Sequence, residues 1–210
     1  VRMPKNKIAL ALIKACGFPI AAPSANSFGK PSPTTAMHVF EDLHGKIPLI
    51  LDGGECQIGL ESTVIDLSGK TPTLLRPGKI TLEQLRKALG KVKVHPAITS
   101  LKKVKTPKAP GMKYKHYAPK AELILVLGSK QNALKKMQKV LNDFQNQGVK
   151  ACIASISGSH SRIAKNLFKE LRKLDSEGFE AIIVQGIPEK KLGLAIMNRL
   201  KRAASKIITA

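Results

Sequence analysis

The segment with the clearest capacity for chemistry is residues 21–35, AAPSANSFGKPSPTT, which holds five hydroxyl side chains, the amide of Asn26 and the amine of Lys30. Its small residues allow a ligand to approach the backbone closely. Hydroxyls, backbone N–H groups and the helix start expected at Thr34 or Thr35 together suit a phosphate or a carboxylate. The same composition also fits an ordinary Pro/Ser surface loop, so the residues alone leave both interpretations open.

Two further segments place polar side chains at the ends of expected strands. In residues 59–66, GLESTVID, Ser62 precedes an apolar run and could face a cleft at a sheet edge. In residues 74–78, LLRPG, Arg76 stands before a Pro-Gly turn, where an arginine can hold a phosphate through two hydrogen bonds. Arg2 is a similar candidate. By spacing alone, an ordinary strand start and surface arginines fit equally well.

The sequence offers no candidate for covalent or metal-dependent catalysis. None of its three cysteines lies in a nucleophile motif, and its five histidines lack metal-ligand spacing. We expect His38 and His44 on or just after a short helix, and His160 in a loop. A reaction here would depend on binding and positioning alone.

The charge of the chain is strongly unbalanced, with 36 Lys and Arg against 14 Asp and Glu and a net charge of +22. Such a charge suits a polyanionic partner, such as tRNA or the phosphates of ATP. A solvated lysine surface explains it equally well. The lysines form no single basic arm, and no aromatic platform for RNA is visible.

The remaining composition favours a cytoplasmic protein with an aliphatic core. Hydrophobic residues make up 43% of the chain, without any Trp. Cys16, Cys56 and Cys152 are scattered and odd in number, which argues against a disulfide framework or a zinc site and fits a reducing compartment. No apolar run approaches the roughly 18 residues of a membrane span, and no signal peptide is visible.

Residues 1–92 should form an α/β unit that positions these polar segments. The pattern predicts a helix over residues 8–15 that ends at Gly17, and a short helix from Thr34 or Thr35 to Leu43. Thr81 with Gln84 reads as the capping box of a third helix, which ends at Gly90. Strands are expected at residues 19–22, 47–51, 62–67 and 72–75.

Residues 121–210 give a clear alternation of strands and helices. Strands are expected at residues 122–127, 150–156 and 179–184, with a closing helix at 194–204. This order implies a small parallel sheet covered on its faces. Because no G-x-G-x-x-G motif follows the first strand, a structural or regulatory role fits this unit best. Residues 93–120, rich in proline and lysine, read as a linker between the two units.

Taken in order, these segments resemble the threonylcarbamoyl-adenylate synthase family in its two-domain form. The linker sequence PGMKYKHYAP at residues 110–119 is the most distinctive, because it separates that form from single-domain YrdC proteins. The other matching segments are VRMP (1–4), APSAN (22–26), SPTT (32–35), LDGG (51–54), GLESTV (59–64), LRPG (75–78) and MNRL (197–200).

The resemblance implies a domain division. Residues 1–92 would be the C-terminal portion of a YrdC-like catalytic domain with a twisted open sheet and helices. Residues 93–120 would be a linker that acts as a lid, and residues 121–210 a Rossmann-like parallel α/β domain. The family's Lys/Arg-rich ATP-binding motif would precede Val1, which puts independent turnover by these 210 residues in question.

The resemblance also implies the chemistry. Threonine and bicarbonate form a carbamate, whose carboxylate attacks the α-phosphate of ATP and releases pyrophosphate. Mg²⁺ would enter with ATP, with few dedicated protein ligands. Partner enzymes then transfer the threonylcarbamoyl group to adenosine beside the anticodon of tRNA.

Site residues follow from the positions of the matching motifs. Threonine would contact Arg2, Ala22 and Ser62. The linker would close over the nucleotide like a lid and exclude water from a labile carbamate and adenylate. The residues that would contact ATP are Ser24, Asn26, Ser32, Arg76, His116 and Tyr117.

Two other functions remain open at this point. A non-catalytic RNA-binding or translation-associated protein on the same scaffold would account for the charge of +22. A carbamoyl-transfer maturation enzyme could share the YrdC-like domain, although the lid linker argues against it.

Overall fold

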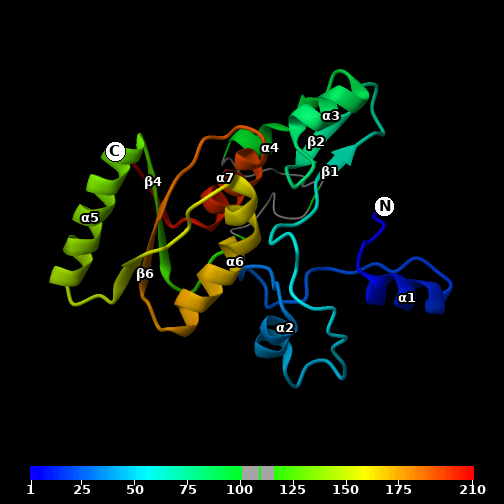
Figure 1. Ribbon diagram of the computed structural model, residues 1–210, viewed down its shortest axis with the longest axis horizontal. Coiled ribbons are helices and arrows are strands. Elements are labelled where there is room, and N and C mark those ends of the chain that lie inside the picture. The colour runs from blue at the N-terminus through cyan, green and yellow to red at the C-terminus, as the bar shows by residue number, and fades with distance from the viewer. Residues whose placement is uncertain (101–108, 110–115) are drawn as a thin grey trace.

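Figure 1 shows the computed structural model, which describes residues 1–100, 109 and 116–210. Helices and two separate sheets make up the molecule, so the α/β class expected from the sequence is confirmed. One sheet lies within the first half of the chain and the other within the second half.

Both N-terminal helices start with a side-chain cap, and the predicted end of the first helix at Gly17 is confirmed. In α1 (Lys7–Cys16) the side chain of Asn6 accepts hydrogen bonds from the first N–H groups, and Gly17 ends the helix with φ +72°. In α2 (Ala36–Leu43) the hydroxyl of Thr35 accepts from the N–H of His38. Helix α2 therefore starts directly after the polar segment 21–35.

The first sheet is small and mixed. Its strands β1 (Val64–Asp66), β2 (Thr73–Arg76) and β3 (Lys93–Val94) lie in that order, β1 antiparallel and β3 parallel to β2. The predicted capping box of Thr81 and Gln84 starts α3 (Leu82–Leu89), and a short helix α4 (Pro96–Thr99) follows β3. Arg76 is the last residue of β2.

The second sheet is fully parallel, with the order β5-β6-β4-β7. It consists of β4 (Glu122–Leu127), β5 (Ala151–Ile153), β6 (Ala181–Gln185) and β7 (Lys206–Thr209). Alternate residues of β4 and β6 face opposite sides. On one side they pack against α5 (Lys130–Asn146), and on the other against α6 (His160–Ser176) and α7 (Leu192–Ala203).

Several sequence expectations need correction. Residues 19–22 and 47–51 form no strand, and most of their side chains are exposed; no described strand lies beside them to complete a ladder. Strands β3 and β7 were not predicted, and β3, which has only two residues, falls with α4 inside the expected linker. Half of that linker lies outside the described residues.

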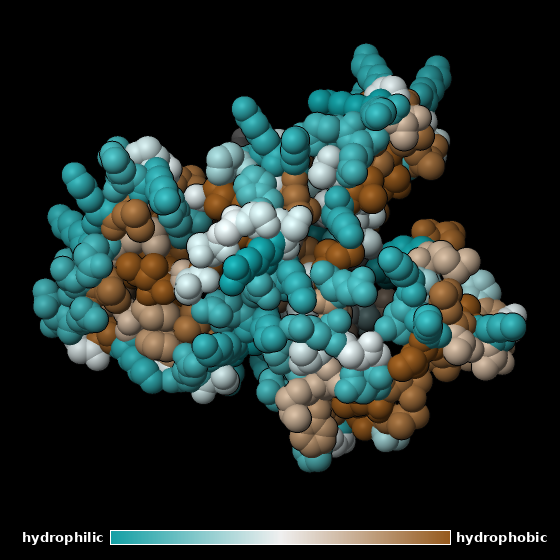
Figure 2. Space-filling model, in the orientation of Figure 1, coloured by the Kyte–Doolittle hydropathy of each residue, from teal (hydrophilic) through white to brown (hydrophobic). Residues whose placement is uncertain are grey.

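Apolar side chains are exposed at the N-terminal end of the molecule. Helix α1 buries none of its residues, and Ile8, Leu12 and Phe18 are 43%, 44% and 63% exposed. Figure 2 shows apolar surface gathered over this end, where α1 and α2 lie in Figure 1. No helix in the described ranges is long and apolar enough to span a bilayer.

Candidate functional site

Ser62 brings two arginines together just before β1. Arg2 Nη1 lies 3.4 Å from the hydroxyl oxygen of Ser62. Arg76 donates from Nε to the carbonyl oxygen of Ser62 at 3.0 Å and from Nη2 to its hydroxyl at 3.3 Å. Residues distant in sequence thus form one cationic cluster at the start of β1 and the end of β2, as expected for a site that holds an anion.

A glycine allows this close arrangement. A Cβ atom on Gly78 would lie 2.4 Å from the backbone nitrogen of Thr63 and 2.7 Å from the carbonyl oxygen of Glu61. The turn after β2 can therefore press against residues 61–63 only without a side chain. The LRPG sequence fixes Arg76 beside Ser62 in this way.

Glu61 links the arginine cluster to residues 21–35, the hydroxyl-rich segment. The Ser32 hydroxyl donates to its Oε1 at 2.5 Å, and Arg199 Nε donates to its Oε2 at 2.7 Å. Burial raises the pKa of Glu61, but the charge of Arg199 and these hydrogen bonds outweigh it and lower the pKa below its ordinary value. Glu61 is therefore an ionised acceptor at neutral pH.

Positive charge predominates in this cluster. Arg76 is 8% exposed and Arg199 is fully buried. Burial lowers the pKa of Arg76, and the nearby charge of Arg199 lowers it further. The contacts of Ser62 and Glu61 thus bring three guanidinium groups, those of Arg2, Arg76 and Arg199, into one cluster with the Glu61 carboxylate, an excess of positive charge that suits an anionic ligand.

Aromatic rings connect the C-terminal end of the expected linker to the hydroxyl-rich segment 21–35. The His116 ring makes an edge contact with Phe28 at 5.4 Å, and Ala118 N–H donates to the carbonyl oxygen of Gly29 at 2.9 Å. The ring of Tyr117 stacks on Phe168 of α6 at 5.4 Å. Tyr117 has a φ of +66°, an uncommon conformation for a non-glycine residue, and is 6% exposed.

A buried ion-pair cluster fixes the same segment to α6. Asp42 of α2 accepts from Lys30 Nζ and Arg172 Nη2, both at 2.7 Å, and Arg172 also donates to the carbonyl oxygen of Pro31. Burial raises the pKa of Asp42, but the bonds from Arg172 and Lys30 dominate and lower it to about 2. Arg172 therefore holds the backbone directly before Ser32.

The predicted site residues Asn26, Ala22 and Ser24 make no described hydrogen bond with the arginine cluster. Asn26 shapes the loop, because its amide nitrogen donates to the carbonyl oxygens of Ser27 and Lys30, while its oxygen is buried without a partner among the described residues. Ala22 and Ser24 are exposed, and no described side-chain hydrogen bond joins them to the arginine cluster.

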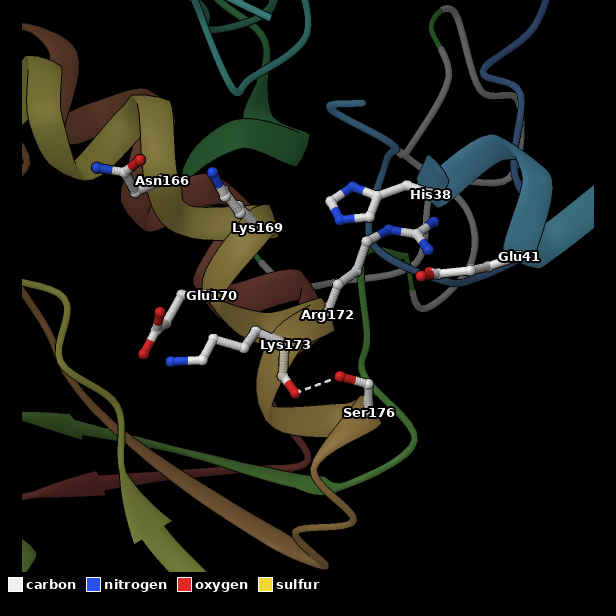
Figure 3. Close-up of a pocket in the computed structure, with 8 residues that line it drawn as sticks. All are labelled: His38, Glu41, Asn166, Lys169, Glu170, Arg172, Lys173 and Ser176. Carbon is white, nitrogen blue, oxygen red and sulfur yellow. Dashed lines mark hydrogen bonds between the residues drawn. The ribbon is translucent and has the colours of Figure 1, made fainter. Parts of the chain in front are cut away.

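The cavity in Figure 3 lies elsewhere, between α2 and α6, and has a volume of about 460 Å³. Arg172 points across it toward α2, and Lys169 and Lys173 come from the same helix. None of the predicted ATP or threonine residues lines it. Burial and the charge of Arg172 lower the pKa of His38, whose Nδ1 accepts from Thr34 N–H, so the ring is neutral at pH 7.

Sequence reasoning assigned no role to four charged residues that the structure brings together: Asp42, Glu61, Arg172 and Arg199. Glu61 and Arg199 lie within GLESTV and MNRL, so their motifs were the available signal. Across residues 1–100, 109 and 116–210, no cluster of His, Cys, Asp and Glu could hold a metal ion.

Comparisons with known proteins cover both halves of the chain. Residues 80–205 match a family model described as "Threonylcarbamoyl-AMP synthase, C-terminal domain". Residues 1–78 match a second model, described as "Telomere recombination".

Similar sequences and solved structures align with nearly the whole chain. The threonylcarbamoyl-AMP synthases of Pyrococcus abyssi and Bacillus subtilis are 50% and 40% identical, each over 97% of this chain. The chain spans only 63% and 62% of their lengths. A crystal structure of P. abyssi Sua5 complexed with L-threonine has 48% sequence identity and a TM-score of 0.94. The match covers 100% of this chain and 65% of the chain in that structure.

Proposed function

Because this chain belongs to the threonylcarbamoyl-AMP synthase family, we propose that it carries most of the substrate site of an L-threonylcarbamoyladenylate synthase. The observation that supports this most directly is the meeting of Arg2, Arg76 and the Ser62 hydroxyl. Residues expected to bind threonine and ATP lie there within hydrogen-bonding distance of each other.

The proposed reaction has two steps. The amine of threonine adds to bicarbonate, loses water and becomes a carbamate. An oxygen of the carbamate then forms a bond to the α-phosphorus of ATP, while the bond to pyrophosphate breaks. Such a transfer requires positioning and charge neutralisation rather than a protein nucleophile.

We assign Arg2, Ala22 and Ser62 to threonine. For Ala22 the support is its position in the APSAN motif rather than a contact, and the same holds for Ser24 on the ATP side. The residues assigned to ATP are Ser24, Asn26, Ser32, Arg76, His116 and Tyr117.

Mg²⁺ would enter as part of the ATP substrate. Glu61 is the carboxylate bonded to Arg199, and Ser32 and Arg199 already occupy its two oxygens. The phosphates of ATP would therefore supply the oxygen ligands that Mg²⁺ prefers.

His116 and Tyr117 would exclude water from the nucleotide. Their contacts with Phe28 and Phe168 place them between the hydroxyl-rich segment and α6. Exclusion of water would protect a labile carbamate and adenylate. We propose residues 1–92 as catalytic domain, 93–120 as lid and 121–210 as a Rossmann-like domain, in a cytoplasmic protein that delivers its product to tRNA-modifying enzymes.

The test is release of pyrophosphate from ATP that depends on both threonine and bicarbonate. It should be run on this chain and on a version extended at its N-terminus with the leading third of the P. abyssi relative. We expect turnover in the extended version and loss of most of it in Arg76→Met. A folded extended version that releases no pyrophosphate would refute the proposal.

The RNA-binding alternative makes a different prediction. Tight tRNA binding with a steep salt dependence, carried by lysines outside the arginine cluster, would favour it. Under the synthase proposal, Arg76→Met weakens ATP binding by about tenfold or more. Charge-reducing changes at exposed lysines such as Lys135 and Lys139 should leave ATP binding unchanged.

A further inference from the structure

Arg199 lies in α7 of the second half of the chain, yet its side chain enters the site of the first half. It is fully buried, and its Nε donates to Oε2 of Glu61 at 2.7 Å. Glu61 in turn accepts from the hydroxyl of Ser32. Glu61, the acceptor of the predicted nucleotide residue Ser32, is therefore held by a helix that begins more than a hundred residues later in the chain.

A second contact joins Arg199 to the lid. Its guanidinium carbon lies 5.4 Å from the centre of the Tyr117 ring, a distance suited to a cation–π interaction. The same ring stacks on Phe168. Arg199 thus touches both the Glu61–Ser32 pair and Tyr117.

One donor of Arg199 is unused. Its Nη1 donates to the side-chain oxygen of Asn198 at 3.1 Å, whereas Nη2 is buried and lacks a hydrogen-bond partner within the described part of the chain. A buried donor without an acceptor destabilises the folded state. A ligand oxygen would relieve that cost.

We propose that Arg199 is a positioning residue of the nucleotide site, which sets Ser32 through Glu61 and sets the Tyr117 ring by direct contact. This inference rests on the synthase function proposed above. It makes the C-terminal unit a working part of that site. A purely structural ion pair between the two halves is the alternative.

The two roles differ in which ligand they affect. The described hydrogen bonds of Arg199 reach Glu61 and Asn198, and do not reach Arg2 or Ser62 on the proposed threonine side. A positioning role therefore predicts a selective loss of ATP affinity. A structural role predicts either no change or a parallel loss of both ligands.

The experiment measures binding of ATP and of L-threonine separately, by titration calorimetry on the N-terminally extended version of this chain. Arg199→Met should weaken ATP binding by about tenfold or more and change threonine binding by less than about twofold. The matched control is Lys201→Met on the same helix, which removes one positive charge from a partly exposed pair with Glu189. It should leave both affinities unchanged.

Two further variants protect the test against misfolding. Arg199→Met leaves the Glu61 carboxylate without its partner, so the double variant Arg199→Met/Glu61→Gln removes both charges together. It should fold and still bind ATP more weakly. Arg199→Lys keeps the charge but not the planar fork, and should recover part of the affinity.

The outcomes separate the two proposals. If Arg199→Met and the double variant bind both ligands as the wild type does, or lose both in parallel, Arg199 is structural and the inference is overturned, while the synthase function stands. If the N-terminally extended chain without further changes binds neither ligand, the proposed function falls and the inference falls with it.

Discussion

Arg172 of α6 and Asp42 of α2 form a buried ion pair, with 2.7 Å between Nη2 and Oδ2. Their side chains are 7% and 1% exposed. Because Arg172 also holds the carbonyl oxygen of Pro31, the pair fixes the hydroxyl-rich segment 21–35 against the C-terminal unit. Because the pair requires an ionised Asp42, the stability of the folded chain should depend on pH.

Asp42→Asn should destabilise the chain by about 3 kcal/mol at pH 7, because it leaves Arg172 buried without its counter-charge. The hydrogen bonds of Asp42 lower its pKa to about 2 in the folded state. Since the unfolded pKa is higher, the contribution of this carboxylate is complete above about pH 5 and is lost as the pH falls toward 2.

Urea unfolding of wild type and Asp42→Asn at several pH values checks this prediction. The difference in unfolding free energy should shrink as the pH falls from about 5 to about 2. The carboxylates common to both proteins cancel in the comparison. A difference that stays constant down to pH 2 would contradict the assigned role.

Gly59→Ala should destabilise the chain by about 1–3 kcal/mol through overpacking. The new Cβ would lie 2.1 Å from the carbonyl oxygen of Lys165 in α6, so α6 would have to move away from the segment that carries Glu61. Thermal unfolding is the measurement. Gly69→Ala is the control, because a Cβ there meets no atom within 4 Å, and equal effects at both positions would refute the argument.

Tyr117→Ala should weaken ATP binding by about tenfold and also lower stability, because the ring packs on Phe168 and beneath Arg199. Tyr117→Phe keeps those ring contacts and should change ATP affinity by less than about twofold. Titration with ATP decides between them. If the two variants lose the same affinity, the hydroxyl rather than the ring is the important group.

The exposed apolar residues of α1 should make this chain bind hydrophobic dyes such as anilinonaphthalene sulfonate. The double change Ile8→Gln/Leu12→Gln should lower the dye fluorescence and alter stability by less than about 0.5 kcal/mol, because neither side chain is buried. Leu134→Gln on α5, 48% exposed, is the control at the opposite end and should lower it less.

The local elements were largely readable from the sequence. Thr35 and Thr81 satisfy helix N–H groups with their own side chains, and apolar runs mark β4 and β6. The strand predictions at residues 19–22 and 47–51 were wrong for the same reason. A strand requires a neighbouring strand, and an apolar run does not reveal whether one is present.

The sequence by itself determined the α/β class, the helix caps and the motifs that mark the family, because each depends on residues close together in the chain. Only the tertiary structure decided that Glu61 bridges Ser32 and Arg199, and that Arg172 holds Pro31. The contacts of Arg199 and Arg172 join residues more than a hundred positions apart, whereas Ser32 and Glu61 are closer in the sequence. Ion pairs leave no periodic signal in a sequence, since their partners are chosen by the packing of α6 and α7 against the first half of the chain.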